Sequence, residues 1–240
     1  MKVGKVLVIA VAMLTQAAVQ ADGAAEKKVW SGDTELGYVK QSGNTETETL
    51  TAKQSLVYDA KPWVNTLTLS GSNTSTDKQR TGEKYYITEQ LDRFITERSY
   101  AFFRGTWEKD RYSGFENQST ALIGYGRKML DTDGLNLKLE LGYGRSMDEI
   151  EETSESIEEN MAYLSEELNW KMNATSKLGQ KLSVEDTEDN RITRFGIFLK
   201  STLMGTFATK ISYDIKNQDE VPDDLKHTDK ELTVSLVYGF

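Results

Sequence analysis

The last ten residues, Glu231-Leu-Thr-Val-Ser-Leu-Val-Tyr-Gly-Phe240, alternate between apolar side chains and smaller or more polar ones. A period of two is typical of a β-strand with one apolar face. Chain termini usually fray, so a strand that ends in an aromatic residue needs a partner that holds it. A barrel closed in lipid supplies that partner, because its last strand pairs with its first and its outer face contacts hydrocarbon. The segment therefore predicts a transmembrane β-barrel.

The same alternation recurs along the chain. Leu135, Leu137, Leu139, Leu141 and Tyr143 share one face of the clearest example, and helical periodicity does not fit it. The segment 85–95 is ambiguous, and 160–172 taken alone also fits a helix. We predict an all-β, up-and-down antiparallel barrel of about 12 strands, each long enough to cross a membrane at a tilt. The strands are expected at 29–41, 47–58, 63–74, 85–95, 99–111, 117–129, 135–146, 160–172, 177–186, 191–201, 207–216 and 230–240.

The expected connections alternate in length. Every second one is short, whereas 75–84, 147–159 and 217–229 are long and polar. Tight turns at one membrane face and longer loops at the other are typical of outer-membrane barrels. An even number of strands puts both termini at the short-turn end, which is the periplasmic side.

Aromatic residues lie near many expected strand ends, where girdles of amphipathic rings sit at membrane interfaces. Aromatic residues are also good strand formers in any sheet, which is the alternative explanation. Those beside the short turns are Tyr58, Trp63, Phe94, Tyr100, Trp170, Phe207 and Phe240, and those near the other ends are Tyr38, Tyr86, Trp107, Tyr143 and Tyr213.

The N-terminus has the pattern of a cleaved secretory signal peptide. Lys2 and Lys5 precede the apolar segment 6–14, and Val19-Gln20-Ala21 supplies a small-residue cleavage site. We expect a signal peptide at 1–21, a short flexible lead at 22–28 and one barrel domain at 29–240. Export by this signal and the barrel pattern together predict an outer-membrane location.

Composition narrows the function classes. The formal net charge is −9, and removal of Lys2 and Lys5 with the signal makes the mature chain more acidic still. An acidic chain is poorly suited to nucleic acid, because binding to phosphates requires a basic surface. There is no cysteine, so an exported chain must hold its fold through burial and ladder hydrogen bonds.

Three short motifs carry a family resemblance over roughly 29–240. They are Gly37-Tyr-Val-Lys-Gln-Ser-Gly-Asn-Thr45 with Thr47 and Thr49, then Glu89-Gln-Leu-Asp-Arg-Phe94, then Thr228-Asp229 with Ser235-Leu-Val-Tyr-Gly-Phe240. Their order and spacing resemble domain of unknown function 481, a family described as salt-induced outer-membrane proteins of Gram-negative bacteria. The resemblance implies a barrel and an outer-membrane address, with no catalytic residues. The end of the chain, with Leu236, Tyr238 and Phe240, is also similar to the aromatic-ended signal that the outer-membrane assembly machinery recognises.

Charged residues fall opposite apolar neighbours in many expected strands. A Lys or Arg that faces lipid at mid-depth costs about 2–4 kcal/mol, so these residues should face the lumen. There they either line a wet pore or pair across the lumen and close it. The expected lumen charges are Asp33, Glu35, Lys53, Arg104, Glu108, Lys138, Glu140, Lys210, Asp214 and Glu231.

The acidic segment 148–159 is the sharpest local feature. Carboxylates of Asp148, Glu149, Glu151 and Glu152 are weak candidates for a divalent-cation site that could bridge to lipopolysaccharide phosphates. No calcium-loop spacing is present, and a solvated, self-repelling loop is the simpler interpretation.

Enzyme motifs are scarce. The single histidine, His227, lies in an expected loop with no serine motif near it. A lipid hydrolase would have to use this residue, so it stays as an alternative that we disfavour. No catalytic residue and no cofactor is expected.

The leading expectation is a non-enzymatic outer-membrane barrel linked to salt or osmotic stress. The sequence leaves open whether this barrel forms a small-solute or ion pore. Its expected partners are outer-membrane lipid, lipopolysaccharide and the assembly machinery. The alternatives are a closed structural barrel that supports envelope integrity, a lipid hydrolase, and a soluble periplasmic β-protein.

Overall fold

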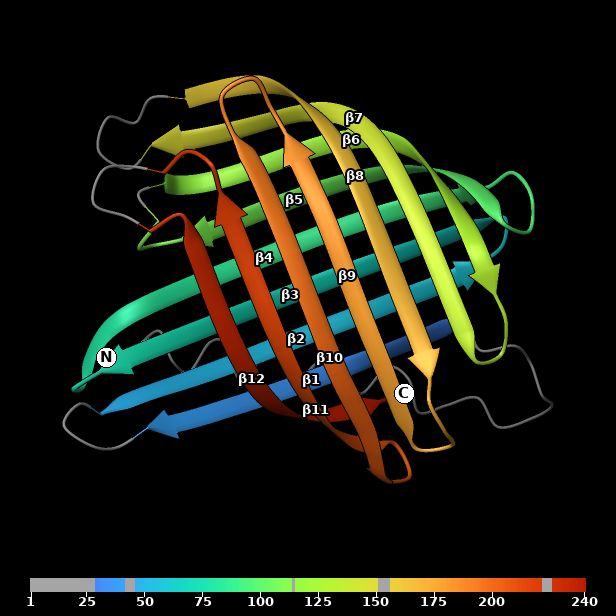
Figure 1. The fold of residues 1–240 in the computed structure, drawn as a ribbon, viewed down its shortest axis with the longest axis horizontal. Coiled ribbons are helices and arrows are strands. Elements are labelled where there is room, and N and C mark those ends of the chain that lie inside the picture. The colour runs from blue at the N-terminus through green and yellow to red at the C-terminus, as the bar shows by residue number, and fades with distance from the viewer. Residues whose placement is uncertain (1–28, 42–45, 114, 151–155, 222–225) are drawn as a thin grey trace.

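Twelve antiparallel strands form one closed barrel in the computed structural model (Figure 1). The structure describes residues 29–41, 46–113, 115–150, 156–221 and 226–240, so the expected signal peptide and lead lie outside it. Each strand pairs with the next in sequence, and β1 pairs with β12 to close the ring. The strands are β1 (Trp30–Gln41), β2 (Thr47–Ala60), β3 (Trp63–Thr76), β4 (Gln79–Phe94), β5 (Ser99–Asp110), β6 (Phe115–Asp131), β7 (Leu135–Ile150), β8 (Ser156–Lys171), β9 (Ser176–Asp186), β10 (Arg191–Met204), β11 (Phe207–Gln218) and β12 (Thr228–Gly239).

The predicted up-and-down barrel of 12 strands is confirmed. The two segments that sequence left ambiguous, 85–95 and 160–172, both lie in strands, β4 and β8. Each is held by hydrogen-bonded neighbours on both sides, and this pairing decides between strand and helix where local periodicity cannot. Within the described ranges, no helix is long and apolar enough to cross a membrane.

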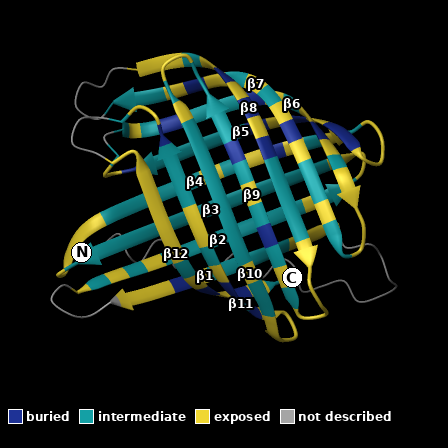
Figure 2. Cartoon of the chain, viewed as in Figure 1, coloured by how far each residue is buried: buried dark blue, intermediate teal, exposed yellow. Residues whose placement is uncertain are grey.

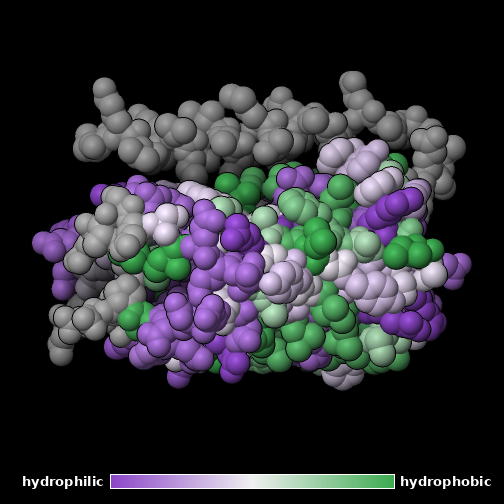
Figure 3. Space-filling model, turned by 90° about the horizontal axis from the view of Figure 1, so that it is seen from above, coloured by the Kyte–Doolittle hydropathy of each residue, from purple (hydrophilic) through white to green (hydrophobic). Residues whose placement is uncertain are grey.

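The outer face of the barrel is largely apolar, as a lipid-facing surface requires. Leu178, Leu199, Ile211 and Val234 pair directly across β9 to β12 and form one outward row. Ile211 is 51% exposed and Val234 is 49% exposed. Figure 2 shows buried residues recurring in dark blue bands between more exposed ones along the strands. Hydrophobic side chains collect in the middle of the face drawn in Figure 3, with hydrophilic ones towards its ends.

Two connections differ from their predictions. The expected long polar loop 75–84 is instead the paired ends of β3 and β4, joined by the two residues Asp77 and Lys78. Both residues have positive φ, 49° and 65°. Positive φ at both central residues is typical of a type I′ hairpin turn, whose backbone twist matches the twist of the flanking strands. The Thr76 and Thr81 hydroxyls also hydrogen-bond at 3.0 Å.

Of the expected long loop 147–159, residues 147–150 belong to β7 and 156–159 to β8, because the polar ends of these two strands pair as well, and 151–155 lie outside the described residues. Polar residues can pair as strands beyond the apolar band, so polarity alone overestimated the length of both loops.

The aromatic girdle also needs correction. Phe94, Tyr100 and Tyr86 face the barrel interior, because they pair in register with other inward residues. Tyr85, the neighbour of Tyr86, is the one on the outer face beside Gly71. Trp30 and Tyr58 do contact each other at the short-turn end, as do Phe207 and Tyr238, with ring centroids 4.8 and 5.2 Å apart.

A buried cluster thickens one wall of the barrel from within. It consists of Tyr100, Phe102, Leu122, Met161 and Tyr163, with Phe94 packed against it. Glycines on β6 and β7 make room for the rings, since a Cβ at Gly126 would lie 2.2 Å from the Tyr100 ring. The interior is therefore asymmetric, with packed side chains over β4 to β8.

Gly126→Ala is expected to destabilise the barrel by about 1–3 kcal/mol, because Tyr100 must leave its recess to admit the methyl group. Urea unfolding of the barrel refolded into lipid vesicles, followed by tryptophan fluorescence, measures this. Gly105→Ala is the matched control, since a Cβ at Gly105 meets no atom within 4 Å. Equal stability of the two variants would show that the recess is not needed.

Candidate functional site: charged groups inside the barrel

Outside the buried cluster around Tyr100, the inner face of the barrel is mostly hydrophilic. Directly paired residues on neighbouring strands share a face, as do residues two apart on one strand. A row of hydroxyls runs around part of this face, through Ser55, Thr68, Thr88, Thr106 and Thr120. Together with the register, these rules place on the same face Asp33 and Glu35 of β1, Lys53 of β2, Arg104 and Glu108 of β5, Lys138 and Glu140 of β7, Lys210 and Asp214 of β11, and Glu231 of β12.

Glu108 connects opposite walls of the barrel. It lies on β5, and its carboxylate is 2.8 Å from Lys216 Nζ on β11 and 3.2 Å from Arg194 Nη2 on β10. In the strand order, β5 and β11 stand on opposite sides of the ring. These ion pairs therefore cross the lumen and narrow it at their level.

A further carboxylate completes what we call the transverse cluster, namely Glu108, Glu185, Arg194 and Lys216. Arg194 Nη1 is 2.5 Å from Glu185 Oε2, so the guanidinium bridges carboxylates of β5 and β9. A cavity of about 30 Å³ lies beside the cluster, bounded by residues that include Glu108, Glu185 and Arg194. That volume holds only a few water molecules. Little free space therefore lies directly beside the cluster.

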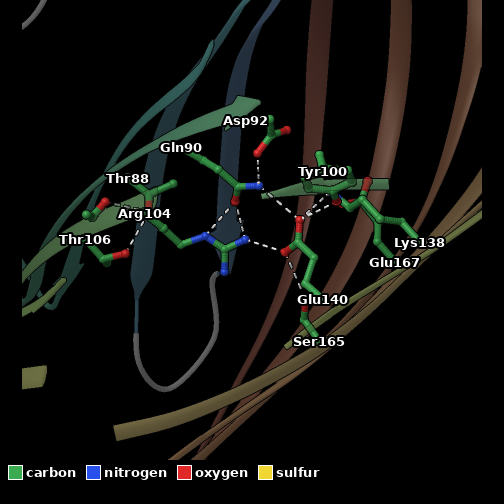
Figure 4. A network of polar contacts seen from close by, with 11 residues as sticks. Thr88, Gln90, Asp92, Tyr100, Arg104, Thr106, Lys138, Glu140, Ser165 and Glu167 are labelled. Carbon is green, nitrogen blue, oxygen red and sulfur yellow. Dashed lines mark hydrogen bonds and ion pairs between the residues drawn. The ribbon is translucent and has the colours of Figure 1, made fainter. Parts of the chain in front are cut away.

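A second group of charges lies on the thickened wall (Figure 4). Glu140 is at its centre and is almost fully buried. Its carboxylate accepts hydrogen bonds from Arg104 at 2.6 Å, Tyr100 at 2.7 Å and Gln90 at 3.0 Å. Ser165 donates a fourth at 3.2 Å. Each oxygen of the buried carboxylate thus has two donors, and a buried charge requires such partners.

We call this group of residues around Glu140 the wall network. Its cations have further partners. Arg104 Nε donates to Gln90 Oε1 at 2.7 Å, and its guanidinium lies 4.6 Å from the Tyr163 ring centroid. Lys138 lies 3.4 Å from Glu140 and 3.1 Å from Glu167. The network joins β4, β5, β7 and β8, so it fixes the packed side chains to the wall.

The opposite wall carries ion pairs that reach over intervening strands. Lys210 on β11 binds both oxygens of Glu35 on β1 at 2.9 Å, and Lys200 on β10 binds Asp33 at 2.9 Å. Asp214 and Glu231 are direct neighbours in the register of β11 and β12. In this part of the lumen, charge pairing runs around the wall and not across it.

The terminal aromatic residues sit at the strand that closes the ring. Leu236 and Tyr238 point outwards on β12, and Phe240 exchanges backbone hydrogen bonds with Gly32 at 3.0 and 3.2 Å. The Phe240 ring also covers Gly32, where a Cβ would lie 2.7 Å from it. This end of the chain is therefore ordered by pairing with β1.

The structure does not join the candidate metal ligands that it describes. Asp148 faces inwards and hydrogen-bonds Gln118 at 3.2 Å, whereas its neighbour Glu149 faces outwards and accepts from Asn117 at 2.8 Å. Glu151 and Glu152 lie outside the described residues. Across the described ranges, His, Cys, Asp and Glu residues form no group of three suited to a metal ion. His227 has its Nδ1 2.9 Å from the Gln218 carbonyl oxygen.

Several of these residues were not singled out from sequence. Arg194 and Lys200 alternate with Phe195, Ile197 and Leu199, so strand parity alone would have placed them inside. The same rule would have found Lys216, two residues after Asp214. Nothing in a single sequence indicates that Glu108 meets both Arg194 and Lys216, because that contact depends on the curvature of the whole ring.

Residues 34–240 match the family described as "Protein of unknown function, DUF481". The chain belongs to this family. A relative described as "Uncharacterized protein YdiY", from Escherichia coli (strain K12), is 29% identical over 219 residues, which is 91% of this chain and 86% of the relative.

Two solved structures with a similar fold are described as a porin and as an outer membrane channel. The NanC porin has a TM-score of 0.50 at 10% identity, covering 87% of this chain and 97% of its own. The COG4313 outer membrane channel from Pseudomonas putida F1 has a TM-score of 0.52 at 11% identity, covering 92% of this chain and 100% of its own. At these identities the likeness shows a shared outer-membrane type of barrel fold.

Proposed function

We propose that this protein is a narrow outer-membrane channel for ions or small solutes, without catalytic activity of its own. The transverse cluster carries the proposal. Charged side chains from opposite walls meet in the lumen, at Glu108, Arg194 and Lys216. Rings of charge and hydrogen-bonding side chains are the means by which channels select and restrict solutes.

The transverse cluster also suggests how salt would act on the channel. Ion pairs weaken as ionic strength rises, since the Debye length falls from about 10 Å at 0.1 M salt to about 3 Å at 1 M. The pairs of Glu108 are partly hydrated, with Glu108 and Lys216 side chains 12% and 14% exposed. We propose that high salt loosens these pairs and widens the lumen, which would connect the barrel to osmotic stress.

Single-channel recording of the mature chain, residues 22–240, in a planar bilayer tests the channel. We expect small unitary steps whose conductance rises with salt more steeply than the conductivity of the solution. A reversal potential in a salt gradient then gives the preferred sign of ion. Insertion is checked separately, by protection of the barrel from protease in vesicles. Silence from inserted protein would overturn the channel and favour the closed structural barrel.

The structural alternative has its own support. The wall network around Glu140 and the transverse cluster both place side chains in the lumen. A barrel that never conducts would serve envelope integrity through its fold alone. Its distinguishing result is a deletion strain that loses envelope integrity under osmotic shock and recovers with a variant that shows no conductance.

We propose an outer-membrane location with both termini at the periplasmic end, together with assembly through the signal at Leu236, Tyr238 and Phe240. The apolar outer face supports contact with outer-membrane lipid, and the acidic segment 148–159 stays a proposed contact with lipopolysaccharide through divalent cations. Mature protein in the outer-membrane pellet is expected, and its recovery in osmotic-shock fluid would favour the soluble periplasmic alternative.

The lipid-hydrolase alternative predicts that His227→Ala lowers lipid turnover, whereas we expect no change.

A further inference from the structure

Four lysines stand side by side on the inner face of β8 to β11. Lys171 pairs with Lys177, Lys177 with Lys200, and Lys200 with Lys210, each directly opposite the next in the register. We call these four residues the lysine row. Lys210 meets Glu35 inside the barrel, and this contact places the row on the lumen side. The row starts at the last residue of β8 and lies towards the short-turn end.

Like charges directly opposite each other on neighbouring strands are destabilising. Arg194 and Lys216 are also direct partners, as are Lys138 and Lys128, but each of these residues has a carboxylate in ion-pair contact. In the row, carboxylates of β1 engage only the half that includes Lys200 and Lys210, at 2.9 Å each. Lys171 and Lys177 are exposed, and among the described residues no carboxylate lies within ion-pair distance of either. Glu167 is the nearest lumen-facing acidic residue on β8, and it forms an ion pair with Lys138 at 3.1 Å.

Neighbouring residues hold part of the row in a defined arrangement. Phe198 lies opposite Gly179, and a Cβ at Gly179 would be 2.2 Å from the Phe198 ring, so the ring covers the strand there. The Lys210 ammonium lies 4.7 Å from the centroid of that ring. Asp33 and Glu35 fix the Lys200 and Lys210 ammonium groups from the other side. Half of the row is thus preorganised, and the other half has unused hydrogen-bond donors.

We propose that the lysine row binds small polyanions that carry two or more carboxylate or phosphate groups. Facing residues on antiparallel strands lie about 4.5–5.5 Å apart, a spacing at which successive anionic groups of one solute can reach successive ammonium groups. Each ammonium has three donors, so a bound anion replaces the hydrogen bonds that water makes to Lys171 and Lys177. The row would then be the entry site for anionic solutes at the short-turn end, and this role rests on the proposed channel function. The binding itself needs only the folded barrel.

Isothermal titration calorimetry of the refolded barrel with tripolyphosphate tests the site, and citrate in a parallel arm separates phosphate from carboxylate recognition. We expect binding that weakens in 1 M salt. Lys171→Gln/Lys177→Gln should raise the dissociation constant at least tenfold, which is about 1.4 kcal/mol. The matched control is Lys40→Gln/Lys109→Gln, which removes the same charge from outer-face positions and should leave the constant unchanged.

Equal loss in both double variants, or no binding of either probe to folded barrel, would overturn the site. Folding of each variant is established beforehand from its urea midpoint. Single-channel recording of the same preparations separates this result from the proposed function. Conductance without binding would support the channel proposal and overturn the anion site. Binding without conductance would support the anion site and overturn the channel proposal.

Discussion

Glu108→Gln is expected to raise single-channel conductance severalfold at low salt. The conductance of this variant should then rise with salt only as steeply as the conductivity of the solution. The carboxylate joins Lys216 and Arg194 across the lumen, at 2.8 and 3.2 Å. Glutamine keeps the size of the side chain but removes the charge, so both cations lose the partner that holds them at the centre. Arg194 would then stay with Glu185 on its own side of the ring, and Lys216 would become free to move.

The matched control for this variant is Glu48→Gln. Glu48 lies on the outer face and pairs with Lys40 in an exposed ion pair at 2.7 Å, so the same chemical change occurs outside the lumen. Its conductance should equal that of the unmodified barrel. If Glu108→Gln gave the conductance of the control at every salt concentration, the transverse cluster would not be the narrowest barrier to ions.

Glu140→Ala is expected to destabilise the barrel by about 3–5 kcal/mol, because it leaves Arg104 buried without its anion. Tyr100, Gln90 and Ser165 lose their acceptor in the same step. A shift of the urea midpoint in lipid vesicles measures the effect. Glu48→Ala removes an exposed carboxylate and should shift the midpoint little, in keeping with the small worth of surface ion pairs.

A second variant separates the lost charge partner from the lost side-chain volume. Arg104→Met combined with Glu140→Leu removes both charges and fills most of the space. Replacement of a buried pair by apolar groups is often close to neutral, so this double variant should be more stable than Glu140→Ala. If it were less stable, the wall network would depend on hydrogen bonds of the two charged groups to Gln90 and Tyr100 more than on their mutual attraction.

The fold followed from the sequence because side-chain alternation has the same period as the strand. Leu135 to Tyr143 show the principle, since five apolar residues at alternate positions can face lipid only in an extended chain. The turn at Asp77 and Lys78 could not be found in this way. Both residues are polar, as are the strand ends around them, and polar residues suit either a loop or a hydrated strand end.

Direction towards lipid or lumen was less predictable for individual residues. The rule that charges point inwards fails for Glu89, which lies on the outer face of β4 and accepts a hydrogen bond from Asn65 at 3.0 Å. The rule that aromatics form girdles fails for Tyr100, which faces inwards because Gly126 provides a recess and Glu140 an acceptor. Both exceptions depend on residues from other strands. Single-strand patterns contain no information about such neighbours.

The pairing that closes the ring is short. β1 and β12 are in register only from Asp33 to Gly37 and from Ser235 to Gly239, whereas β1 pairs with β2 along its full length. Figure 1 shows the described parts of β1 and β12 diverging beyond that point. All other pairings join consecutive strands and form with little loss of chain entropy, but this one brings opposite ends of the sequence together. Ring closure should therefore be the last step of assembly, and the backbone amides of this joint should be the first of the barrel to exchange with deuterium.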